Sequence, residues 1–147
     1  MQFEDILNKY REIAFSGSDL GTRFEELIAR YLMTDPLYSS KLEKVWSWNN
    51  FPHRKDISDH DTGIDLVART KAGEYWAIQC KFYSDEHRVS KDDVDTFLST
   101  SGKQFRDESG ERRTFSYRMI VATTNDWTET AVKATENQAI PVMRVGL

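Results

Sequence analysis

The chain has 147 residues, of which 39% are hydrophobic and 30% charged. This length is enough for one domain with its own core, and the composition excludes a disordered chain. A net charge of −4 argues against a free-standing nucleic-acid binder, because such proteins neutralise phosphates with a basic surface. The single cysteine, Cys80, excludes an internal disulfide and suits a reducing compartment.

Targeting signals are absent from the sequence. The N-terminus lacks the basic region and apolar run of a secretory signal, and no stretch is apolar enough to cross a bilayer. We therefore expect a cytoplasmic protein. No repeat, linker or low-complexity run interrupts the chain, so residues 1–147 are expected to form a single domain.

Two amphipathic helices are predicted at the start of the chain. Apolar residues recur at helical spacing from Phe3 to Ala14 and again from Leu20 to Leu32. Asp35-Pro36 ends the second helix. Glu25 lies at the edge of the second apolar stripe, next to Phe24. Its carboxylate is either a solvated helix residue or a group that looks along the neighbouring sheet.

A first strand and a long polar loop are predicted next. Residues 45–48 form the strand, with Trp46 and Trp48 packing on the same side. Residues 49–62 form the loop, and long loops in compact domains are usually functional or disordered. Its histidines and aspartates lack the spacing of a zinc site.

Residues 63–82 predict a β-hairpin. Two runs rich in apolar and β-branched residues flank Lys71-Ala72-Gly73, and Gly73 suits the last turn position, where φ is positive. A hairpin centred on Ala72 places Asp65 opposite Gln79. Since side chains alternate along a strand, Lys81 shares a face with Gln79 and lies diagonal to Asp65. The opposite face is expected to be a core face made of Ile64, Leu66, Trp76, Ile78, Cys80 and Phe82.

The rest of the chain predicts a helix, a strand, a helix and a strand. Ser90 to Asp93 resembles a capping box, and the helix after it would bury Val94, Phe97 and Leu98. Residues 103–113 form a charged excursion, and residues 119–122 a buried strand. A helix capped by Asn125 or Asp126 runs to about Gln138, and residues 140–145 close the sheet, with Pro141 at an edge or at the strand's first residue. Strand–helix–strand units of this length form right-handed parallel crossovers, which predicts an α/β mixed sheet flanked by helices.

The polar residues of the hairpin carry a family resemblance. Asp61-Thr62-Gly63-Ile64-Asp65 followed by Gln79-Cys80-Lys81 resembles the D-x-G-x-D…Q-x-K signature of Mrr-like restriction endonucleases, a branch of the PD-(D/E)XK superfamily. Gly21 to Glu25 resembles the G-x-x-F-E of the same branch. Residues 77–103 are also similar to the nuclease segment of single-polypeptide Type I (Type ISP) restriction enzymes and related helicase fusions. The resemblance implies a PD-(D/E)XK restriction-endonuclease-like sheet and a Mg²⁺-dependent DNA endonuclease, with Mn²⁺ as a substitute, in a bacterial cytoplasm.

The resemblance also implies roles for individual residues. Mg²⁺ prefers oxygen ligands, which Asp65, the side chain of Gln79 and the backbone carbonyl of Cys80 would supply. Glu25 would orient a metal-bound water or help to hold a second ion. Lys81 would lower the pKa of the attacking water or stabilise the transition state, and the sequence leaves both roles open.

The chain departs from the superfamily pattern in two places. Ile64 stands where the eponymous proline would be, and that residue does no chemistry. Gln79 replaces a carboxylate, which weakens metal affinity and favours one metal ion. The structural alternative for these residues is an ion pair between Asp65 and Lys81, with Gln79 hydrogen-bonded to it.

The expected substrate is double-stranded DNA. Candidate phosphate contacts are His53, Arg54 and Lys55 in the long loop and His87 and Arg88 after the hairpin, with plain solvated charges as the alternative. The resemblance and the acidic balance imply a nuclease domain excised from the N-terminus of a larger enzyme. Its helicase/translocase, methyltransferase and target-recognition domains would deliver the nuclease to DNA. The alternative function is a catalytically inactive nuclease-like module that binds DNA or proteins.

Overall fold

The structure is a computed structural model that describes residues 5, 8–9, 17–57, 62–83 and 87–146. The predicted N-terminal helix lies outside the described residues, except that residues 5, 8 and 9 are helical. Asp61 of the family signature also lies outside them. In the described part of the chain, no helix has the length and apolar character needed to cross a membrane.

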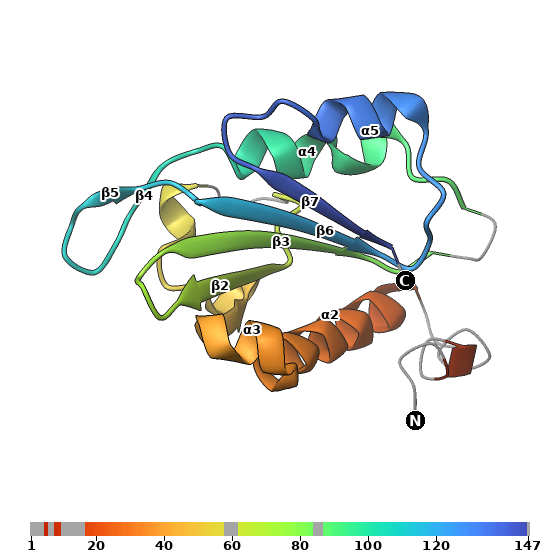
Figure 1. The fold of residues 1–147 in the computed structure, drawn as a ribbon. Coiled ribbons are helices and arrows are strands. Elements are labelled where there is room, and N and C mark those ends of the chain that lie inside the picture. The colour runs from red at the N-terminus through yellow and green to blue at the C-terminus, as the bar shows by residue number, and fades with distance from the viewer. Residues whose placement is uncertain (1–4, 6–7, 10–16, 58–61, 84–86, 147) are drawn as a thin grey trace.

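A five-stranded mixed sheet forms the centre of the molecule (Figure 1). Its strands, in spatial order, are β1 (Leu42–Ser47), β2 (Leu66–Thr70), β3 (Tyr75–Lys81), β6 (Tyr117–Ala122) and β7 (Val142–Gly146). The first three strands pair antiparallel, and β6 and β7 continue the sheet parallel to β3. This is the mixed sheet that the sequence predicts, with the strand that follows Pro141 at its edge.

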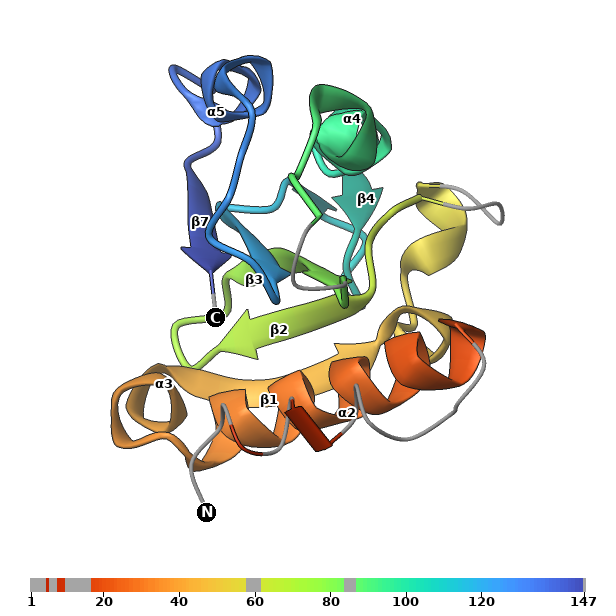
Figure 2. The same cartoon turned by 90° about the vertical axis from the view of Figure 1, so that its right-hand side faces the viewer.

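Helices cover both faces of the sheet (Figures 1 and 2). Helices α2 (Gly17–Thr34) and α3 (Pro36–Lys41) lie on one side, and α4 (Lys91–Thr100) and α5 (Glu129–Thr135) on the other. The predicted break at Asp35-Pro36 is confirmed. Asp35 also caps α3, which the sequence did not predict, by accepting hydrogen bonds from the N–H groups of Leu37 and Tyr38. Two short 3₁₀ turns, η1 (Trp48–Asn50) and η2 (Arg54–Asp56), occupy the long loop.

The capping box before α4 is confirmed, but the predicted start of the last helix is wrong. Asp93 Oδ2 accepts from the backbone N–H of Ser90, which closes the box. Helix α5 begins only at Glu129, with Thr128 as its cap. The backbone before the helix pairs with Val89 instead: the Asp126 carbonyl accepts from the Val89 N–H at 2.8 Å, and the Thr128 N–H donates to the Val89 carbonyl at 2.9 Å.

The two faces of the sheet bury separate cores. Against α2 lie Leu66, Ala68, Ile78 and Cys80 with Phe24, Ile28 and Leu32. Against α4 lie Val67, Ala77, Ile120 and Ala122 with Val94 and Phe97. Ile64 was expected on the first face, but it packs in the second core. Gly63, at φ +71°, precedes it, and β2 starts only at Leu66, so strand alternation does not extend back to Ile64.

The hairpin register is confirmed. Leu66 pairs with Ile78 and Arg69 with Tyr75, so the hairpin is centred on Ala72. Gly73 adopts φ +87°, and its N–H donates to the carbonyl of Thr70 at 2.9 Å. A second hairpin, β4 (Phe105–Arg106) with β5 (Arg112–Arg113), occupies the region that the sequence predicts only as a charged excursion.

Substitutions of Gly63 and Gly73 test how closely the chain at Gly63 approaches the backbone of Phe97. Gly63→Ala should lower the free energy of unfolding by about 3 kcal/mol, because the left-handed backbone disfavours a Cβ and overpacking adds a further cost. The new Cβ would lie 2.9 Å from the backbone nitrogen of Phe97. Gly73→Ala meets nothing within 4 Å and should cost only about 1 kcal/mol. Equal losses in urea unfolding would contradict the close approach at Gly63.

Candidate active site

Asp65 lies just before β2, and hydrogen bonds fix both its backbone and its side chain. Its N–H donates to the carbonyl of Ile78, and its carbonyl accepts from the N–H of Trp48, both at 2.9 Å. Its carboxylate Oδ2 accepts from the backbone N–H of Cys80 at 2.7 Å. A charge-assisted bond of this length is strong. The carboxylate is therefore held beside the segment Gln79-Cys80-Lys81, as the hairpin register predicts.

Glu25 reaches the same place from helix α2. The preceding residue, Phe24, is fully buried and packs edge-on against the ring of Phe82 at 5.6 Å between centroids, which fixes this turn of the helix near the end of β3. Burial raises the pKa of Glu25 from 4.5 to about 7, and the negative charges of Asp65 and then Glu26 add to the effect. The charge of Asp65 contributes to the raised pKa of Glu25, so the two carboxylates lie near each other.

Cys80 contributes its backbone to this site. Its thiol is buried in the core under α2, and burial, followed by the charges of Asp65 and Glu25, raises its pKa well above the usual value. A thiol in such surroundings stays protonated and unreactive. The predicted inert, core-facing cysteine is what the structure contains.

Gln79 points away from the core in which the Cys80 thiol is buried, toward α4. Its side chain is 2% exposed, and its Nε2 donates to the backbone carbonyl of Asp93 at 3.4 Å. Its Oε1 is buried and has no hydrogen-bond partner in the described part of the chain. Leaving such an oxygen unpaired is costly, so the site is incomplete without a cation or a proton donor. The sequence could not reveal the contact with Asp93, because backbone carbonyls have no residue signature.

Lys81 is the last residue of β3 and is half-buried. Among the described residues, no carboxylate is paired with its ammonium group. The structural ion pair with Asp65 that the sequence left open is therefore not present among these residues. Lys81 thus places an uncompensated cation one residue beyond the Cys80 N–H to which Asp65 binds.

The histidines among the candidate DNA contacts are partly occupied by protein neighbours. The His53 side chain is 15% exposed, with Nε2 at 3.3 Å from Glu108 Oε2. His87 stacks on the ring of Tyr83 at 3.9 Å, and its Nε2 lies 3.1 Å from Asp93 Oδ2. Both rings therefore pack against the protein rather than projecting freely.

The basic candidates belong to two separate regions. Arg88 pairs with Asp126 near the start of α4. Arg54 and Lys55 belong to η2, where Lys55 is exposed and Arg54 donates weakly to a backbone carbonyl. The five predicted residues thus do not form one continuous surface in the described structure.

The donor set fits a hydrated magnesium ion better than zinc. Among the described residues, no group of three or more His, Cys, Asp or Glu could hold a metal. The candidate ligands are the two carboxylates of Asp65 and Glu25, beside the backbone of Cys80. The Gln79 side chain adds an oxygen that has no hydrogen-bond partner among the described residues. Mg²⁺ usually takes one or two carboxylates and keeps several waters, so this sparse set suits it.

Comparison with known proteins relates this geometry to a family. A model of the restriction endonuclease family Mrr_cat_2 matches residues 33–147. The chain is also similar to the solved ATP-dependent Type ISP restriction-modification enzyme LlaBIII bound to DNA, with 28% identity and a TM-score of 0.72. That comparison covers 100% of this chain and 8% of the other. No curated protein matches the chain. Glu25 precedes the region that the family model matches, whereas the solved structure covers it.

The raised pKa of Glu25 predicts a specific pH dependence of stability. Between pH 4.5 and about 7 the folded protein holds a proton that the unfolded chain releases. The contribution of Glu25 is therefore fully present below pH 4.5 and is lost as the pH rises through about 7. In metal-free buffer, Glu25→Gln should gain stability relative to wild type between pH 5 and pH 8.

Urea unfolding at the two pH values checks this prediction. Glu136→Gln is the control, because it removes an exposed charge just after α5, away from Glu25, and should keep the wild-type loss of stability. A stability difference between Glu25→Gln and wild type that is the same at pH 5 and pH 8 would show that the pKa of Glu25 is not raised in the folded protein.

Proposed function

The chain belongs to the restriction endonuclease family, and from that premise we propose that it is a metal-dependent DNA endonuclease domain of a larger restriction-modification enzyme. Its mixed sheet with helices on both faces agrees with the PD-(D/E)XK restriction-endonuclease-like fold.

The observation that carries the proposal is the pair of carboxylates at the end of the hairpin. Burial raises the pKa of Glu25 to about 7 and the negative charge of Asp65 adds to the shift, so keeping both carboxylates ionised costs free energy. Repulsion of this kind weakens a fold unless a cation compensates it. A divalent ion, Mg²⁺ or Mn²⁺, would relieve the repulsion, and the unpartnered oxygen of Gln79 supports an additional ligand there.

Each residue would then have a defined task. Asp65 and the oxygen of Gln79 would hold the ion together with the backbone carbonyl of Cys80. A bound divalent ion supplies Lewis-acid polarisation of the phosphate and lowers the pKa of water. Glu25, whose pKa lies near neutrality, would accept a proton from the attacking water. Lys81 would stabilise the negative charge on the phosphate while the new P–O bond forms and the bond to the leaving oxygen breaks.

The proposed substrate is double-stranded DNA, reached with the help of other domains. The similar Type ISP enzyme is described as DNA-bound and ATP-dependent, and this chain spans 8% of its length. The net charge of −4 is poorly suited to independent DNA binding. We therefore place helicase/translocase, methyltransferase and target-recognition domains in the same polypeptide, in a bacterial cytoplasm, with little sequence preference in this domain itself.

Plasmid nicking by the full-length protein tests the assignment of residues. With Mg²⁺ or Mn²⁺ present, Asp65→Asn and Lys81→Ala should each reduce the cleavage rate by roughly 100-fold or more, since each removes a charge that acts on the reacting phosphate. Lys71→Ala, an exposed lysine in the turn at the other end of the same hairpin, is the control and should cleave as wild type does.

The outcome separates the endonuclease from its alternative. Cleavage at wild-type rates by Asp65→Asn and Lys81→Ala would remove the site assignment. No cleavage by wild type with either metal would favour the inactive module that binds DNA or proteins.

Metal binding can also be measured without cleavage. At ten times its dissociation constant, Mg²⁺ or Mn²⁺ should raise the melting temperature by about 3–5 °C. At one fixed metal concentration the shift should be larger at pH 8 than at pH 6, because Glu25 must lose its proton to face a cation. Asp65→Asn should abolish the shift and Glu26→Gln should retain it. A shift that persists in Asp65→Asn would place the metal elsewhere.

A further inference from the structure

A group of cations lies around the β4–β5 hairpin and the neighbouring turn η2, away from the candidate active site. We call this group the basic face. It consists of Arg54, Lys55, Lys103, Arg106 and Arg112. All are exposed except the half-buried Arg54, and none has an ion-pair partner among the described residues. An unpaired basic surface is unexpected on a chain whose net charge is −4.

Two of these cations face each other directly. Arg106 and Arg112 are partners in the antiparallel ladder of β4 and β5. Directly opposed residues project to the same side, and like charges in that position destabilise a hairpin. The neighbouring pair places the buried Phe105 opposite Arg113, whose guanidinium is neutralised by Asp107 at 2.9 Å. Burial and ion pairing thus account for Phe105 and Arg113, but they do not account for the pairing of Arg106 with Arg112.

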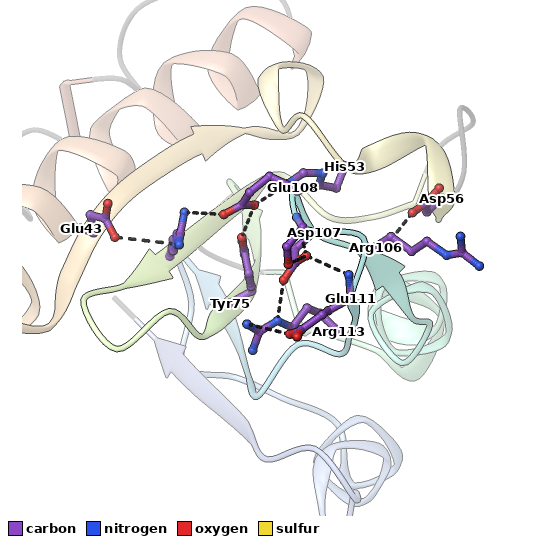
Figure 3. Close-up of polar contacts among 11 residues, drawn as sticks. Glu43, His53, Asp56, Tyr75, Arg106, Asp107, Glu108, Glu111 and Arg113 are labelled. Atoms are coloured by element: carbon purple, nitrogen blue, oxygen red, sulfur yellow. Dashed lines mark hydrogen bonds and ion pairs between the residues drawn. The ribbon is translucent and has the colours of Figure 1, made fainter.

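The acidic residues nearby are committed to other partners (Figure 3). Asp56 Oδ2 accepts from the backbone N–H of Arg106 at 2.7 Å, and the guanidinium of Arg106 extends away from it. Glu108 pairs with Arg69 at 3.2 Å and with His53 at 3.3 Å. The hairpin is thus tied to η2 and to the sheet, while Arg106 and Arg112 keep their charges for an external anion.

The shape of this surface suits an extended polyanion rather than a small enclosed ligand. Arg106, Arg112, Gln104 and Asp56 line an open hollow of about 260 Å³. Arginine guanidinium groups bind phosphate with paired hydrogen bonds, and an open basic surface tracks a nucleic-acid backbone. Lys55 and Lys103 are exposed and directly precede Asp56 and Gln104, which line the hollow.

The position of the basic face relates it to the candidate active site. The ring of Phe105 packs against Tyr75, the first residue of β3, at 5.1 Å between centroids. Lys81 lies at the opposite end of that strand. Six strand residues span about 20 Å, and this corresponds to roughly six base pairs of B-DNA. A duplex that reaches both places would be held about half a turn from the phosphate being cleaved.

We propose that Arg106 and Arg112, flanked by Lys55 and Lys103, form a second contact with the phosphate backbone of duplex DNA, separate from the cleavage site. This proposal rests on the proposed nuclease function and adds an anchoring surface to it. The contact reads no bases and supplies affinity that the acidic remainder of the chain lacks.

Binding of a duplex by the full-length protein in metal-free buffer tests the proposal. Arg106→Gln/Arg112→Gln removes two phosphate contacts. The plot of log association constant against log salt should therefore become less steep by about 1.8, and binding should weaken roughly 60-fold at 0.1 M salt. The loss should be the same for two duplexes of unrelated sequence. Arg30→Gln/Lys41→Gln removes two exposed cations from α2 and α3 and should bind as wild type does.

Thermal unfolding distinguishes lost binding from lost folding. Because the opposed arginines repel each other, Arg106→Gln/Arg112→Gln should be at least as stable as wild type. Affinity and salt slope equal to wild type, or an equal loss in the control pair, would overturn the proposal. Plasmid cleavage by wild type with Mg²⁺ tests the nuclease function separately from the second DNA contact. Normal cleavage with unaffected binding in the variant refutes the anchor alone, and absent cleavage with weakened binding refutes the nuclease alone.

Discussion

The hydrogen bond from the Cys80 backbone to the Asp65 carboxylate fixes the geometry on which the candidate site depends. It requires the hairpin register centred on Ala72, because a shift of one residue would present a different N–H to Asp65. It also requires the left-handed turn at Gly63, which brings the chain against the backbone of Phe97 before it enters β2. A turn and a register, rather than any feature of the carboxylate itself, thus decide where the negative charge lies.

Electrostatics oppose stability at this place. Burial, with the charge of Asp65 added to it, lets Glu25 retain its proton up to about pH 7, while Gln79 has a buried oxygen without a hydrogen-bond partner among the described residues. Arg106 and Arg112 show the same principle at a distance, since two like charges are directly opposed in the ladder and neither has an ion-pair partner among the described residues. Like charges that are held together cost free energy in the isolated protein, and binding a partner of opposite charge offsets that cost. A divalent ion is that partner at the first place, and a phosphate backbone at the second.

Patterns within short stretches of sequence correctly predicted the hairpin register and the start of one helix. Strand alternation with Gly73 gave the register, and the Ser90 capping box gave the start of α4. Tertiary contacts decided the rest. The backbone of residues 126–128 pairs with Val89, and the last helix begins only at Glu129. The β4–β5 hairpin has strands of two residues each, which are too short for any hydrophobic period.

The candidate site was predictable only as far as sequence spacing extends. The register placed Asp65 beside the segment that contains Gln79, but it did not show that α4 covers the Gln79 amide. The most direct measurement is anomalous scattering from crystals of the full-length protein grown with Mn²⁺ at pH 8. We predict a manganese peak bound to the carboxylate of Asp65, with Glu25 beside it within reach of a metal-bound water, and loss of that peak in Asp65→Asn. A peak bound away from both residues, or one unchanged in Asp65→Asn, would contradict it.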